Sequence, residues 1–100
     1  MNSKHYNNSR ELRETIIRAI GYGNIVKSVV VDNGHPNGPE IHQLSDTGII
    51  TIYNQRTLKM ITKLIARPGQ VRRYYKQGES IPKKIIELAL EHQKMMWCDA

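Results

Sequence analysis

The segment Gly48–Tyr75 constrains the fold most strongly, because it reads as two β-strands that run into a basic stretch with adjacent tyrosines. Ile49–Tyr53 and Leu58–Ala66 are rich in isoleucine and leucine, which favours strands. The polar residues Asn54–Thr57 separate them and are typical of a turn. The sequence therefore predicts a hairpin against which the rest of the chain packs.

Apolar residues alternate with polar or basic ones along this hairpin, which predicts one apolar face and one polar face. If residues of equal parity pair across it, for example Ile52 with Met60, the even-numbered hydrophobic residues share one face. Such pairing needs a loop of three or five residues, and both lengths are common in hairpins. The opposite, polar face is then expected to carry Ile49, Thr51, Tyr53, Lys59, Ile61 and Lys63.

The remaining segments predict helices at both ends of the chain and two more strands. Ile25–Val31 is almost continuously apolar, so we expect a central strand buried on both faces. The other predicted elements are a helix Ser9–Ile20 capped by Asn8, a loop Asp32–Pro39, a strand Glu40–Ser45, a short helix Pro68–Lys76, and a last helix after Ser80 with the core stripe Ile85, Leu88, Ala89, His92 and Met96.

These elements predict the α+β class and one domain over residues 1–100. The order is an N-terminal helix, a three- to four-stranded, mostly antiparallel sheet, a short helix and a C-terminal helix. We expect the first and last helices to cover one face of the sheet. The ends, residues 1–8 and 97–100, are expected to be frayed.

Positive charge is concentrated in one part of the chain. The formal net charge is +6, yet residues 56–84 alone carry +8, with Glu79 as their one acid. Such a basic patch is the expected footprint of a polyanion. We predict a nucleic-acid partner, RNA in preference to DNA, and a solvated lysine-rich surface is the alternative. The candidate nucleic-acid-binding residues are Lys59, Lys63, Arg67, Arg72, Arg73, Tyr74 and Lys76.

Two of the four histidines, His35 and His42, flank the Gly/Pro-rich loop beside the basic hairpin. Imidazole suits proton transfer near neutral pH, and RNA cleavage also needs cations to stabilise the phosphorane. The candidate catalytic residues are therefore His42, His35, Lys63 and Arg67. The side of the sheet that His42 takes is open: a two-residue loop at Ser45–Gly48 pairs it with Thr51 on the polar face. A three-residue loop pairs Leu44 with Ile50 and sends His42 to the core side.

Other classes of site have little support in the sequence. Cys98 is the one cysteine, and Asp32, His35 and His42 do not have a recognised metal-ligand spacing, so we expect neither metal nor cofactor. Phosphate-binding and nucleophile motifs are missing. No apolar run is long enough for a transmembrane helix, and the first residues do not read as a secretory leader, so we expect a cytoplasmic protein without membrane contact.

The order of elements resembles the barnase–EndoU–colicin–RelE group of small ribonuclease toxins. The resemblance covers Glu40–Arg73, about a third of the chain: a histidine near the start of the meander, then Ile-Thr-Lys-Leu on a later strand. Those domains cleave RNA without metal on an open sheet face. The resemblance implies roles for His42, Thr62, Lys63 and Arg67, although parity places Thr62 and Lys63 on opposite faces. The short basic chain also resembles uncharacterised proteins of phages and conjugative elements.

Three functions follow as hypotheses. The first is an RNA-directed nucleic-acid-binding domain that acts as a metal-independent endoribonuclease, with a protein inhibitor as a partner if it is a toxin. The second is a noncatalytic DNA- or RNA-binding accessory protein that uses the same basic residues. The third is a protein-interaction module that dimerises through a sheet edge or through Ile49, Ile61 and Ile65.

Overall fold

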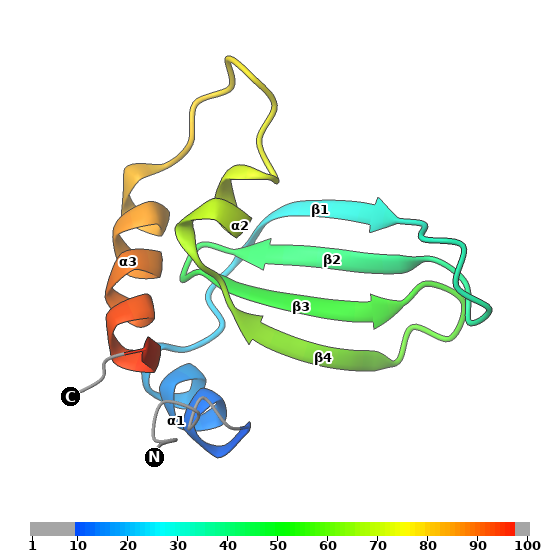
Figure 1. Ribbon diagram of the computed structural model, residues 1–100, viewed down its shortest axis with the longest axis horizontal. Coiled ribbons are helices and arrows are strands. Elements are labelled where there is room, and N and C mark those ends of the chain that lie inside the picture. The colour runs from blue at the N-terminus through cyan, green and yellow to red at the C-terminus, as the bar shows by residue number, and fades with distance from the viewer. Residues whose placement is uncertain (1–9, 98–100) are drawn as a thin grey trace.

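The computed structural model describes residues 10–97 of the chain. It shows an N-terminal helix, a four-stranded antiparallel sheet and two further helices, which confirms the predicted α+β class (Figure 1). The elements are α1 (Arg10–Ile20), β1 (Ile25–Val31), β2 (Glu40–Ser45), β3 (Ile49–Asn54), β4 (Met60–Ile65), α2 (Pro68–Arg72) and α3 (Lys83–Trp97).

The strands form a simple meander in the order β1-β2-β3-β4, so β1 lies at an edge of the sheet (Figure 1). The predicted central position of β1 is therefore wrong. Four of its apolar residues are exposed, and Val30 keeps 57% of its surface in contact with solvent. Its apolar run reflects β-propensity at an open edge rather than burial on both faces.

Two hydrophobic clusters lie on opposite faces of the sheet. Leu44 and Ile50 pack with Val71 of α2 and Ile85 of α3. Ile49 and its cross-strand partner Ile65 pack with α1 instead. Because neighbouring residues of a strand point to opposite faces, α1 packs against one face and α2 with α3 against the other, all at one end of the sheet (Figure 1). The prediction that the first and last helices share one face is wrong.

The predicted pairing of equal parity between β3 and β4 is confirmed, with Ile52 opposite Thr62 and Ile50 opposite Leu64. The specific pair Ile52–Met60 is wrong, because a bulge after Ile52 places Met60 opposite Tyr53. The bulge therefore moves Met60 to the polar face, and β4 begins at Met60 rather than at Leu58.

The turn between β2 and β3 determines the side on which His42 lies. Gly48 has a φ of 85°, in the left-handed region, and its N–H donates to the carbonyl of Ser45 at 3.0 Å. The register pairs Leu44 with Ile50 and His42 with Ile52, which is the three-residue-loop alternative. His42 therefore points to the face covered by α2 and α3.

Helix boundaries differ slightly from those predicted. The short helix α2 ends at Arg72 rather than at Lys76, and α3 extends to Trp97, which had been predicted to belong to a frayed tail. In α3 the predicted core residues Ile85, Ala89 and His92 are buried. The Asn8 cap, the helix start at Ser9 and the predicted fraying of residues 1–8 and 98–100 lie outside the described residues.

Candidate functional site

An open groove of about 350 Å³ lies on the sheet face that carries His42, next to α2. The polar side chains that line it come from two elements. His42 belongs to β2, Gln70 belongs to α2, and Arg73 and Tyr74 directly follow α2. Its apolar lining consists of Val29, Val31, Ile50, Ile52 and Leu64. Such a mainly apolar hollow with a few convergent polar groups is the usual form of a ligand site.

The imidazole of His42 is fixed by a neighbour on its own strand. Glu40 lies two residues away and so points to the same face, and its Oε1 lies 3.0 Å from His42 Nε2. An ionised carboxylate can only accept a hydrogen bond, so Nε2 carries the proton. When the ring is neutral, Nδ1 is the proton acceptor; both side chains of the pair are half-buried, and His42 lines the groove.

Arg73 and Tyr74 bring a cation and a phenol to the same groove. Val71 is completely buried and anchors α2, while Arg73 directly after the helix stays exposed. Tyr74 packs against the core cluster, and burial raises its pKa to about 12. Its hydroxyl is therefore a weaker acid than a free phenol: it stays protonated at neutral pH and can donate a hydrogen bond or, to a more basic alkoxide, a proton.

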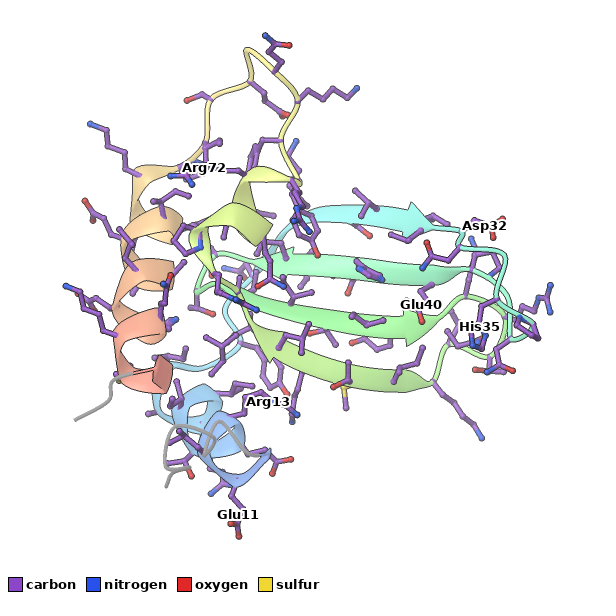
Figure 2. All side chains as sticks on the ribbon, in the orientation of Figure 1. Glu11, Arg13, Asp32, His35, Glu40 and Arg72 are labelled. Carbon is purple, nitrogen blue, oxygen red and sulfur yellow. The ribbon has the colours of Figure 1, made fainter. Side chains whose placement is uncertain are left out.

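The structure does not bring the four predicted catalytic residues together. Lys63 points to the face opposite His42, where its Nζ lies 5.5 Å from the centre of the Tyr22 ring. A hydrogen bond to Tyr22 raises the pKa of Lys63. His35 lies in the loop at the end of the sheet opposite α2, and its Nδ1 accepts from the Asn37 N–H at 3.1 Å (Figure 2). Arg67 immediately precedes α2 and does not line the groove.

The predicted nucleic-acid-binding residues are also divided. Only Arg73 and Tyr74 line the groove, while Arg67 lines an adjoining cavity. Lys59 is exposed beside the turn between β3 and β4, and the exposed residues Arg72 and Lys76 lie on and after α2. Figure 2 shows Arg72 at the end of the molecule that holds the helices.

Sequence reasoning missed Glu40 and Gln70. A signal for Glu40 was present, because residues two apart on a strand share a face and Glu40 and His42 are so spaced. Thr62, in contrast, was correctly predicted to lie on the face opposite Lys63, since it pairs with Ile52 beside His42.

Within residues 10–97, no three His, Cys, Asp or Glu side chains are close enough together to hold a metal ion. In the same part of the chain, no helix has the length and apolar character needed to cross a membrane. No protein-family model matches the chain, and no curated protein or solved structure is significantly similar to it.

Proposed function

We propose that this protein binds RNA in the groove beside α2 and cleaves it there without a metal ion. The observation that carries the proposal is the joint presence of His42, Arg73 and Tyr74 in one open groove, with His42 oriented by Glu40. These are a proton acceptor, a permanent cation and a protonated phenol, the groups that phosphodiester cleavage requires.

In the proposed reaction, the 2′-oxygen of the substrate attacks the adjacent phosphorus atom. His42 Nδ1 takes the 2′-hydroxyl proton while the new O–P bond forms, and the bond between phosphorus and the 5′-oxygen breaks. A proton from the Tyr74 hydroxyl reaches the departing 5′-oxygen and is replaced afterwards from the imidazolium. The products are a 2′,3′-cyclic phosphate and a 5′-hydroxyl, so atoms and charge balance.

Arg73 and Glu40 have supporting roles in this scheme. The Arg73 guanidinium is exposed at the groove and can hold two phosphate oxygens as negative charge grows on them. Glu40 fixes the ring tautomer and stabilises the imidazolium that forms, so it acts through His42 as a positioning residue. The net positive charge of residues 56–84 favours the approach of any polyanion.

The test is an RNA-cleavage assay in excess EDTA, with identification of the product ends. Wild-type protein is expected to release fragments with 2′,3′-cyclic phosphates, and Glu40→Gln is expected to retain slower cleavage with an altered pH profile. Intact RNA after long incubation with folded wild-type protein would refute the activity. Cleavage that depends on added Mg²⁺ would refute the proposed mechanism.

A second candidate function is association with a second copy through β1. The specific observation is that β1 is an edge strand of the sheet, with Ile25, Val26, Val29 and Val30 exposed. An open, apolar edge of this kind is a template for pairing with another strand. Sedimentation at micromolar concentration should then show a dimer for the wild type and a monomer for Val30→Lys. A strictly monomeric wild type would contradict it.

A further inference from the structure

A second cavity, of about 400 Å³, adjoins the His42 groove on the other side of Arg73. Its polar lining consists of Arg67, Gln70 and Arg73 together with Gln93 of α3. Gln70 and Arg73 line both hollows, so the two are neighbours that share one guanidinium and one amide. The surface beside α2 thus offers two adjacent spaces rather than one.

The polar side chains that line the second cavity are cations and amides, and among the residues that the structure describes no carboxylate lines it. Glu79, the one acid of residues 56–84, forms an ion pair with Lys27 of β1 and so is engaged elsewhere. Gln70 Oε1 accepts the Arg67 N–H at 2.9 Å, so the donor that Gln70 can offer a ligand is its Nε2 group. Two guanidinium groups and amide donors suit a phosphate and the polar edges of a nucleotide.

We infer that the protein takes a single-stranded RNA segment of at least two nucleotides across these hollows. This inference rests on the proposed function. One nucleotide lies in the groove beside His42, with its base against the apolar floor, and the next lies in the cavity of Arg67 and Gln93. Arg73, which borders both hollows, holds the phosphodiester between them. Separate hollows can each receive an unstacked base, whereas the bases of a duplex are stacked and paired.

The inference is tested by how affinity depends on ligand length. Uridine 3′-monophosphate and 2′-O-methyl oligouridylates of increasing length are titrated into the intact protein, since the 2′-O-methyl group blocks cleavage. The longer ligands are expected to bind about tenfold more tightly than the mononucleotide, because a charged group contacts their second nucleotide. A hairpin duplex of similar length is expected not to show this gain.

Two variants examine the second cavity. Gln93→Glu places a negative charge in its lining, and Arg67→Gln removes a positive one. In each variant the longer oligonucleotides are expected to bind less than about twofold more tightly than the mononucleotide. Gln55→Glu is the matched control for Gln93→Glu, because Gln55 is an exposed residue in the turn between β3 and β4. The control should keep the wild-type gain, and circular dichroism checks that all variants are folded.

The outcomes separate this inference from the proposed function. Wild-type affinity that does not change with ligand length overturns the second site but leaves the His42 groove. Variants that weaken the mononucleotide and the longer ligands by the same factor also overturn it, because the loss then is not confined to a second nucleotide. Wild-type protein that binds none of these ligands overturns both proposals.

Discussion

Replacing Gly48 with alanine tests the turn that sends His42 to the groove face. Gly48 has a φ of 85°, which an L-residue rarely adopts. Its carbonyl accepts the Ala66 N–H at 2.8 Å and its own N–H donates to the Ser45 carbonyl, so the turn is bonded to the last residue of β2 and to the residue that follows β4. Alanine must therefore take up the left-handed conformation or break these hydrogen bonds.

The expected cost follows from the surroundings of the added methyl group. A Cβ atom at Gly48 would lie 3.8 Å from His92 Nδ1 and 4.0 Å from Cε1, which is ordinary van der Waals contact. Steric overlap therefore contributes little, and the cost is the backbone strain of about 1–2 kcal/mol for a left-handed L-residue. In a domain of this size, about 1 kcal/mol lowers Tm by about 4–8 °C.

The assay is thermal and urea unfolding of three variants beside the wild type. Gly48→Asn should lose less stability than Gly48→Ala, because asparagine tolerates the left-handed region better. Gly69→Ala is the matched control, since Gly69 does not have a positive φ and a methyl group there meets open space. That control should be neutral or stabilised by up to about 1 kcal/mol. Gly48→Ala as stable as wild type would refute the reasoning.

Three further predictions concern the core, pH and salt. Leu44→Ala should cost about 2–5 kcal/mol, because Leu44 is completely buried, whereas Leu90→Ala, at a half-exposed site, should cost far less in urea unfolding. Burial lowers the pKa of His92 in the fold, only partly opposed by Glu91, so stability should be lost as pH falls from about 6.5 towards the folded-state pKa. His92→Leu should flatten this dependence, and an unchanged pH profile would contradict the assignment. For single-stranded RNA, the logarithm of the binding constant falls linearly with the logarithm of the salt concentration, and Arg73→Gln should reduce the magnitude of this slope by about 0.7. Lys63→Gln should reduce the slope less, and equal reductions would count against the groove.

Local patterns in the sequence predicted most element positions but not how the elements are arranged. The bounds of β1 and β2 were predicted correctly, because β-branched runs and glycine-rich turns are local signals. The edge position of β1 was not predicted, because an apolar run does not determine how many strands pair with it. The bulge after Ile52 was also missed, and it moved Met60 to the other face.

The candidate site was only partly predictable for a related reason. His42 and Arg73 were named from residue type and charge, yet their proximity depends on the turn at Gly48 and on how Val71 anchors α2. Lys63 carries a suitable charge but lies on the opposite face. Side-chain direction thus separates residues that charge alone groups together.

A decisive experiment compares His42→Ala with Lys63→Ala in the EDTA cleavage assay. The two residues lie on opposite faces of one sheet, so the comparison asks which face carries the chemistry. If the groove cleaves RNA, His42→Ala, shown to be folded by circular dichroism, loses cleavage while Lys63→Ala still cleaves. Cleavage retained by His42→Ala and lost in a folded Lys63→Ala would contradict cleavage in the groove.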